Sequence, residues 1–153
     1  MENIKYRRAD IKDLVTLYKF EQAIVATERP FDPTLKPGHI NYYDIKAMID
    51  DNDTEVIIAE VDLEIVGSGY VKISNAKSYL NFEKYAYAGF MYVKPGYRRK
   101  GISQTIIEKL KSWAKSKNVN ELRLDVYDEN HIAVAAYEKI GLQKHLVEMR
   151  MKI

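Results

Sequence analysis

The 153-residue sequence contains no cysteine, only four prolines and seven glycines, and no long apolar run. The absence of cysteine excludes a disulfide framework, a thiolate metal site, and any enzyme that uses its own thiol as the nucleophile. No apolar run is long enough to span a bilayer, and the first residues lack the cationic and apolar segments of a signal peptide. We therefore expect a soluble, cytoplasmic protein with no membrane partner.

The charge balance is close to neutral, which limits the expected partners. The chain carries 24 Lys plus Arg against 22 Asp plus Glu, a formal net charge of +2. This excess is too small for nucleic acid to be the expected partner. The three histidines show no metal-ligand spacing, so no metal site is expected either. With 46% hydrophobic residues, the chain can build one core, and we expect a single domain over residues 1–153.

Helical and strand periodicities alternate along the chain, which is typical of an α/β fold. The first half predicts a strand over 4–8, a helix capped by Asp10 and a second helix capped by Asn41. Apolar residues recur at helical spacing after Asp10, namely Ile11, Leu14, Val15 and Tyr18. Three of the four prolines lie within 27–39, so this segment is expected to be a turn-rich loop.

The second half begins with β-branched runs that predict the main strands of a sheet. Residues 56–61 and 65–73 predict a hairpin with its turn at 62–64. Residues 85–93 contain no charge, which suits a central strand covered on both faces. The remaining expected elements are a helix from Ile102, a strand carrying Leu122, Leu124 and Val126, a helix between its cap Asn130 and Gly141, and a closing strand within 142–153.

The strongest local signal is the turn between the uncharged strand and the next helix. Residues 94–103 place cationic side chains and glycine directly before a helix N-terminus. The first amides of a helix are unpaired and its dipole favours negative charge, so such a turn can bind an anion such as pyrophosphate. For the turn alone, a solvated basic turn is an equally good interpretation. A nucleic-acid patch is a poorer one, because the net charge is small.

This turn resembles the pyrophosphate loop of the GNAT superfamily of acyl-CoA-dependent N-acyltransferases, which reads Arg or Gln, two residues, Gly, one residue, Gly or Ala. The matching residues are Arg98, Arg99, Lys100, Gly101, Ile102 and Ser103, with Ser at the last small position. A second segment, 130–142, resembles the family's Asn-x-x-Ala-x-x-x-Tyr-x-Lys-x-Gly-Phe helix, with Leu142 in place of Phe. Two motifs in the correct order are much more specific than either alone.

The resemblance covers nearly the whole chain and implies a GNAT-like fold. Such a fold has a central, mostly antiparallel sheet, helices on both faces, and splayed fourth and fifth strands with acetyl-CoA between them as co-substrate. The backbone at Met91 and Val93 would then hold the acetyl carbonyl and the pantetheine. The other cofactor contacts implied by the resemblance are Arg98, Arg99, Lys100, Gly101, Ser103 and Asn130. Asn130 is expected to act as an N-cap in any case.

Tyr137 is the catalytic residue that the resemblance implies. Its phenol would donate a hydrogen bond or a proton to the departing thiolate. Tyr137 also lies in an apolar stripe with Ala133, Ala136 and Ile140, so a core tyrosine is the alternative when burial alone is considered. The intact motif favours the catalytic role.

The sequence identifies neither the general base nor the acceptor. The uncharged strand offers no carboxylate, which leaves Glu28, Glu83, Asp125, Tyr92 or a water chain to take the substrate proton. Acidic side chains in the loop would attract an amine, and Arg29 would hold a carboxylate; a proline-stiffened loop with solvated charges is an equal alternative. The residues expected to meet the acceptor are Glu28, Arg29, Tyr42, Tyr43 and Tyr92.

The predicted function is direct transfer of an acetyl group from acetyl-CoA to a primary amine of a small molecule, peptide or protein. The absence of cysteine excludes an acyl-cysteine relay. The alternative is a non-catalytic acyl-CoA-binding regulatory module, motivated by the missing strand carboxylate. Few residues follow Leu142, so we expect one strand over 146–151 and a sheet edge that is short, bent or completed by a second subunit. The last case would make the protein a homodimer.

Overall fold

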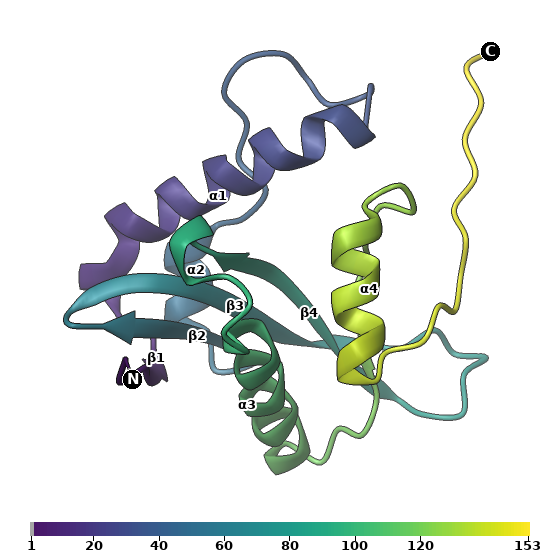
Figure 1. Cartoon of the computed structure of the whole chain (residues 1–153). Helices are drawn as coiled ribbons and strands as arrows, with labels where there is room; N and C mark the ends of the chain where they lie inside the picture. Colours follow the sequence, from purple (N-terminus) through teal and green to yellow (C-terminus); the bar gives the residue numbers. More distant parts are fainter. Residues whose placement is uncertain (1) are drawn as a thin grey trace.

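The computed structural model describes residues 2–153 and contains a five-stranded sheet with helices packed on it (Figure 1). Its helices and strands are β1 (Lys5–Arg8), α1 (Leu14–Glu28), α2 (Ile45–Asp50), β2 (Thr54–Val61), β3 (Glu64–Asn75), β4 (Lys84–Val93), α3 (Ile102–Ser116), β5 (Leu122–Arg123) and α4 (His131–Ile140). The strands lie in the order β1-β2-β3-β4-β5 and are antiparallel except for the pair β4 and β5. The predicted mixed, mostly antiparallel fold is confirmed.

Helices cover both faces of the sheet, and β2 reflects this in its sequence. Val56 and Ile58 belong to the core cluster formed with α1 and α2. Ile57 and Ala59 belong to the cluster formed with α3. Because successive strand residues point to opposite faces, a strand covered on both sides is apolar at nearly every position. The sheet is therefore held between two separate cores.

Helix α1 begins after one 3-10 turn, and Asp10 caps that turn as predicted. The Asp10 N–H also donates to the Asp13 carboxylate at 2.8 Å, which completes a capping box. The predicted apolar face of this helix is wrong, because three of its residues, Ile11, Val15 and Tyr18, are exposed to solvent. Ile11 lies in the 3-10 turn, so the helical spacing starts later than the sequence pattern indicates. The buried residues of α1 are Leu17, Phe20, Glu21 and Val25.

The second helix starts later than predicted, and Asp44 rather than Asn41 is its N-cap. The Asp44 carboxylate accepts the Ala47 N–H at 3.0 Å. The N–H groups of Tyr42 and Tyr43 donate to the carboxylate of Glu21 in α1 at 2.9 and 2.8 Å. The backbone before Asp44 is therefore tied to α1 and does not begin the helix.

The hairpin between β2 and β3 forms where it was predicted. Asp62 and Leu63 make the connection with φ values of 48° and 68°, as a two-residue hairpin turn requires. Further along β3, Gly69 lies under α3: a Cβ at this position would be 2.6 Å from Cγ2 of Ile106. This close contact sets the height of α3 above the sheet.

The end of the chain differs from the prediction. β5 contains only Leu122 and Arg123, so the expected continuation through Leu124 and Val126 is not paired. Residues 142–153 form no strand, and Figure 1 shows them leaving the sheet beside α4 as an extended tail. The expected closing strand is therefore wrong for the single chain. The physical reason is that a strand needs a partner edge, and no residue of 142–153 pairs with one in the sheet.

Candidate active site

The edge of β4 that faces β5 forms one wall of the candidate site. β4 pairs with β5 only at Ala86 and Tyr87, after which the two strands part. On the opposite edge, the Lys94 N–H donates to a carbonyl of β3 at 2.9 Å. The polar groups of successive strand residues alternate between the two edges, so those of Val93 and Met91 face the open side. The predicted cofactor residues of β4 thus lie on a strand edge without a partner strand.

A bulge in β4 lies directly before Met91. Phe90 has a φ of 55°, and the pairing with β3 shifts between Ser68 and Tyr70. The Phe90 N–H donates to the hydroxyl of Tyr43 at 3.2 Å, and the Ser68 hydroxyl donates to the Phe90 carbonyl at 2.9 Å. These two side chains satisfy the polar groups that the bulge removes from the ladder. Tyr43, predicted to meet the acceptor, therefore also supports the bulge.

The cationic turn follows β4 and ends at the first residue of α3. Arg99 and Gly101 have φ values of 63° and 77°, and Gly101 is the N-cap of α3. No side chain among residues 2–153 caps the first turn of α3. Ser103 is half-buried in that turn. The backbone N–H groups of this turn are therefore free to bind an anion, and the pyrophosphate contact itself stays a prediction.

The three cations of this turn have different surroundings, although all are exposed. Arg98 donates through Nε to the Val93 carbonyl at 3.0 Å, which links the turn to the open edge of β4. Lys100 pairs with Glu2 at 2.6 Å. Arg99 makes no hydrogen bond or ion pair with any residue in the described part of the chain. The turn therefore presents concentrated positive charge beside the open edge of β4.

Helix α4 carries two further predicted site residues, Asn130 at its N-cap and Tyr137. Asn130 is its N-cap and accepts the Ala133 N–H at 3.2 Å, as expected. Burial, and then the charge of Glu28, raise the pKa of Tyr137 to about 12. The Tyr137 hydroxyl has no hydrogen-bond partner among the described residues. The predicted apolar stripe of α4 is wrong at Ala136, which is exposed, whereas Val134 is buried.

Glu28 connects this helix with the loop that follows α1. Its carboxyl group is half-buried, and burial followed by the charge of Asp32 raises its pKa. Its charge also contributes to the raised pKa values of Tyr42 and Tyr137. Side chains from three separate segments of the chain therefore interact electrostatically near the end of α1.

The loop residues Arg29 and Asp32 are already engaged within the protein. Arg29 donates to the carbonyl of Lys36 at 2.8 Å and to that of Gly38. Asp32 accepts a hydrogen bond from the Tyr127 hydroxyl at 2.7 Å. The guanidinium of Arg29 therefore closes the loop, and its predicted role as a carboxylate partner stays a prediction.

The other predicted acceptor residues differ in their hydrogen bonding. The hydroxyl oxygen of Tyr42 is buried and has no partner among the described residues. Buried hydroxyl groups are normally hydrogen-bonded, so this oxygen lacks the partner that its burial would lead one to expect. Tyr92 packs its ring on Phe20, with ring centroids 4.5 Å apart. Tyr92 therefore belongs to the core that supports β4 from the α1 side.

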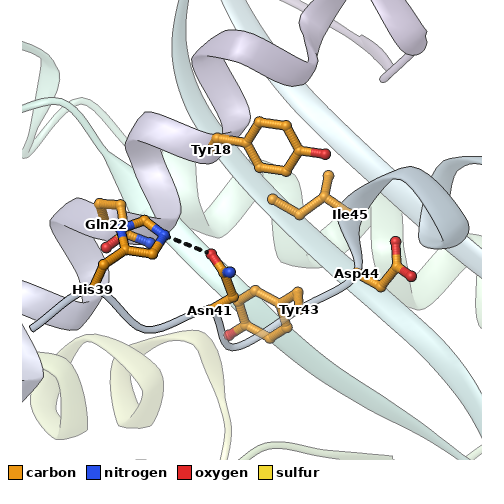
Figure 2. A pocket seen from close by; sticks show the side chains of 7 residues that line it. All are labelled: Tyr18, Gln22, His39, Asn41, Tyr43, Asp44 and Ile45. Carbon is orange, nitrogen blue, oxygen red and sulfur yellow. Dashed lines mark hydrogen bonds between the residues drawn. The ribbon is translucent and has the colours of Figure 1, made fainter. Parts of the chain in front are cut away.

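A groove of about 490 Å³ lies between α1 and the segment leading to α2 (Figure 2). It is lined by Tyr18, Gln22, His39, Asn41, Tyr43, Asp44 and Ile45. The side chain of Gln22 donates to the carbonyl of Ile40 at 2.8 Å, and His39 and Asn41 are 3.2 Å apart, which the dashed line in Figure 2 marks. Tyr43 belongs both to this groove and to the β4 bulge.

Sequence reasoning missed Glu21, Ser68 and Tyr127. Glu21 is fully buried and holds the segment before α2. Its signal was present, because it follows Leu17 and Phe20 at helical spacing on the buried face. Ser68 and Tyr127 act through partners that are distant in sequence, so no local pattern marks them.

Residues 2–153, the part of the chain that the structure describes, offer neither a metal-ligand cluster nor a membrane-spanning helix. No group of three or more His, Cys, Asp or Glu side chains in this part of the chain is arranged to hold a metal ion. None of the helices in the described range has the length and apolar character needed to cross a membrane.

The site combines an open strand edge with a cationic turn at a helix N-terminus, an arrangement that suits an extended anionic ligand. The sequence profile of the acetyltransferase (GNAT) family matches residues 17–142. An N-alpha-acetyltransferase of Saccharolobus solfataricus is 30% identical over 113 residues, which cover 71% of this chain and 68% of that protein. The chain therefore belongs to the acetyltransferase (GNAT) family. Enzymes of this family use acetyl-CoA as co-substrate. As a member of the family, the chain is an acetyl-CoA-dependent N-acetyltransferase.

Two solved structures illustrate the shared fold. A "predicted acetyltransferase" from Clostridium acetobutylicum, crystallised with acetyl-CoA, superposes with a TM-score of 0.74 at 21% identity, covering 98% of this chain and 96% of that one. An aminoglycoside antibiotic 6'-N-acetyltransferase from Acinetobacter baumannii gives a TM-score of 0.75 at 17% identity and covers 99% of each chain. At these identities the likeness establishes the fold.

Proposed function

We propose that the chain transfers the acetyl group of acetyl-CoA directly to a primary amine of a small molecule, peptide or protein within a ternary complex. The observation that carries this proposal is an open β4 edge that leads into an uncapped helix N-terminus. Acetyl-CoA supplies a thioester that an amine can attack. The protein supplies binding, orientation and hydrogen bonds to the charges that develop. With no cysteine in the chain, the acetyl group has no enzyme thiol to pass through.

The residues of the cleft fit such a co-substrate. The unpaired strand edge at Met91 and Val93 matches an extended chain that contains amide groups, and it offers an N–H to a carbonyl oxygen. The free amides of the first turn of α3 and the cations beside them match a pyrophosphate. The proposed pyrophosphate contacts are Arg98, Arg99, Lys100, Gly101 and Ser103. We also assign the side-chain amide nitrogen of Asn130 to the cofactor, since its oxygen is used by the cap.

The proposed role of Tyr137 is to donate a hydrogen bond to the leaving thiolate. Its pKa of about 12 keeps the phenol protonated at neutral pH. An ordinary thiol has a pKa of about 8.5, so complete proton transfer from this phenol would be uphill by roughly 5 kcal/mol. Hydrogen-bond donation therefore fits Tyr137 better than proton transfer. Tyr137→Phe should lower kcat while acetyl-CoA still raises the melting temperature; unchanged turnover would remove the residue from this role.

The proposed acceptor is a cationic amine that binds beside Glu28, Asp32 and Tyr42. The half-buried Glu28 carboxylate interacts electrostatically with the phenol of Tyr137, which supports an acceptor amine bound near the leaving group. A carboxylate whose pKa is raised toward neutrality is a better proton acceptor than an ordinary one. Glu28 is therefore the general base that we propose, in the absence of a carboxylate on β4.

The test of this role is the pH dependence of Glu28→Gln. Removal of a general base lowers the rate by about a hundredfold or more at neutral pH. The deficit should shrink toward alkaline pH, where the amine is already neutral. Glu83→Gln is the matched control, because Glu83 is an exposed carboxylate before β4. A loss that is equal at every pH would contradict the base role and leave a purely structural one.

A non-catalytic acyl-CoA-binding module is the second candidate, and one observation favours it: β4 carries no carboxylate. The two functions are separated by measuring CoA release from acetyl-CoA with small amines, amino acids and peptide N-termini. Turnover with any of these at raised pH excludes the regulatory module. Stabilisation by acetyl-CoA without turnover across the panel would favour it, and no stabilisation at saturation would exclude both.

A further inference from the structure

A hydrogen bond joins β4 to the segment after β5 where the two strands part. Tyr87 is the last β4 residue that pairs with β5, and its hydroxyl donates to the carboxylate of Asp125 at 3.0 Å. Burial, and then the hydrogen bond to Asp125, raise the pKa of Tyr87, so its phenol stays protonated and keeps donating at neutral pH. The bond occupies one oxygen of the exposed Asp125 carboxylate and leaves the other without a partner among the described residues. A positioned carboxylate therefore lies beside the start of the open β4 edge.

The charge of Asp125 is not neutralised by an ion pair within the described chain. The basic residue closest to it in sequence, Arg123, is engaged elsewhere. Its Nε atom lies 3.7 Å from the carboxylate of Glu121, and its guanidinium lies 5.5 and 5.6 Å from the ring centroids of Phe82 and Tyr85. A carboxylate that has a free oxygen and no cationic partner attracts the cationic group of a ligand. Asp125 is thus suited to hold an ammonium group.

A row of tyrosine rings runs from Asp125 toward the acceptor side. Neighbouring ring centroids in this row are 6.4, 5.5 and 5.9 Å apart, and its members in order are Tyr87, Tyr70, Tyr43 and Tyr42. All but the last pack into the core cluster between the sheet and the helices α1 and α2. At the far end, burial and then the charge of Glu28 raise the pKa of Tyr42, so that carboxylate is near the last ring. Two carboxylates therefore lie at opposite ends of one aromatic row, on the α1 side of the sheet.

We propose that Asp125 binds a second cationic group of the acceptor, which makes the acceptor a primary diamine. This inference rests on the proposed function, in which the reacting amine lies beside Glu28. Each ammonium group then meets one carboxylate, and the carbon chain between the two nitrogens lies along the edges of the tyrosine rings. Alkyl chains with charged ends pack on apolar surfaces in this way. A monoamine fills only one of the two positions.

Only the amine beside Glu28 is acetylated. Its ammonium form gives one proton to Glu28, and the neutral nitrogen then attacks the thioester carbonyl. The amide bond forms, the C–S bond breaks, and the second proton that the nitrogen loses ends on the CoA sulfur, whose negative charge Tyr137 stabilises. The products are the mono-acetylated diamine and CoA, and the amine at Asp125 keeps its charge.

The test compares diamines with monoamines of the same chain length. CoA release gives kcat/KM for diaminobutane, diaminohexane and diaminooctane, and for butylamine, hexylamine and octylamine. Two equivalent amines alone favour a diamine by about twofold, and one exposed ion pair adds a factor of up to about five. At least one diamine should therefore exceed its monoamine by about five- to tenfold. Asp125→Asn should reduce this ratio to about two, whereas Asp128→Asn, at a nearby exposed carboxylate, should leave it unchanged.

The outcomes separate this inference from the proposed function. A ratio of about two in the unmodified protein, or a higher ratio that Asp125→Asn leaves unchanged, would overturn the second amine site while acetyl transfer stands. If no amine releases CoA, the proposed function fails, and calorimetry of diaminohexane and hexylamine with the CoA-loaded protein decides the second site. Tighter binding of the diamine that is lost in Asp125→Asn would support it, and equal or absent binding of the two amines would refute it.

Discussion

The hydrogen bond between Tyr43 and the β4 bulge can be removed without changing the packing around it. The Tyr43 hydroxyl accepts the Phe90 N–H at 3.2 Å, and Phe90 is 1% exposed. In Tyr43→Phe the ring can keep its contacts with Tyr70 and Phe90, whose centroids lie 5.5 and 5.2 Å away. The buried N–H would lose its partner, which costs about 1–3 kcal/mol. For a domain of this size, the melting temperature should fall by roughly 2–10 °C.

The same substitution should affect catalysis more than cofactor binding. Met91 follows Phe90 directly, so a looser bulge misdirects the N–H proposed to meet the acetyl carbonyl. Complete loss of an oxyanion donor lowers kcat by about 10²–10³-fold, and a misdirected donor should lower it by about tenfold. The KM for acetyl-CoA should change little. Tyr70→Phe is the control, because that hydroxyl has no hydrogen bond among the described residues. Equal kcat and melting temperature in the two variants would refute the reasoning.

Three further results follow from the glycines and tyrosines. Gly69→Ala should destabilise the fold by about 1–3 kcal/mol in chemical denaturation, because its Cβ would meet Ile106 at 2.6 Å; an unchanged midpoint would contradict this packing. Gly101→Ala should lower the free energy of unfolding by about 1–2 kcal/mol, because alanine is strained at a φ of 77°, and calorimetry should show weaker CoA binding. Gly96→Ala is the control: its added Cβ also meets no atom within 4 Å, so both properties should be unchanged. Burial raises the pKa of Tyr137 to about 12 and raises those of several other tyrosines, so the folded chain holds these protons more tightly. Stability should therefore stay level up to about pH 10 and fall above it, and a flat melting temperature from about pH 8 to pH 11 would contradict this sign.

The cofactor side of the site could be predicted because its signals are local. A helix cap such as Asn130 and a left-handed stop such as Gly141, with φ 114°, depend on residues within one or two turns. The turn at 94–103 is similar, since a strand end, a glycine and a helix start follow each other in the sequence. The hairpin at Asp62 and Leu63 belongs to the same class. Short-range rules are sufficient for these elements.

The acceptor side could not be predicted, because distant residues decide it. Asn41 has the right chemistry for a helix cap, but Glu21 takes the N–H groups of the residues after it. Asp32 is bonded to Tyr127, which lies 95 residues away. The composition of the loop after α1 does not indicate that Glu21 or Tyr127 would be the hydrogen-bond partners. The tail is a third case, because its alternation predicts a strand correctly only if a partner edge is within reach.

These long-range contacts join the acceptor side to the cofactor side. The buried carboxylate of Glu21 holds the backbone N–H of Tyr43, and the hydroxyl of the same Tyr43 holds the β4 bulge. The segment before α2 therefore cannot move without either breaking these bonds or moving the backbone next to Met91. Because Glu21 is fully buried and accepts two N–H groups, breaking its contacts would leave unpaired polar groups in the core, which is costly. The amides of β4 and the acceptor loop thus form one mechanical unit, although more than 40 residues separate them in the sequence.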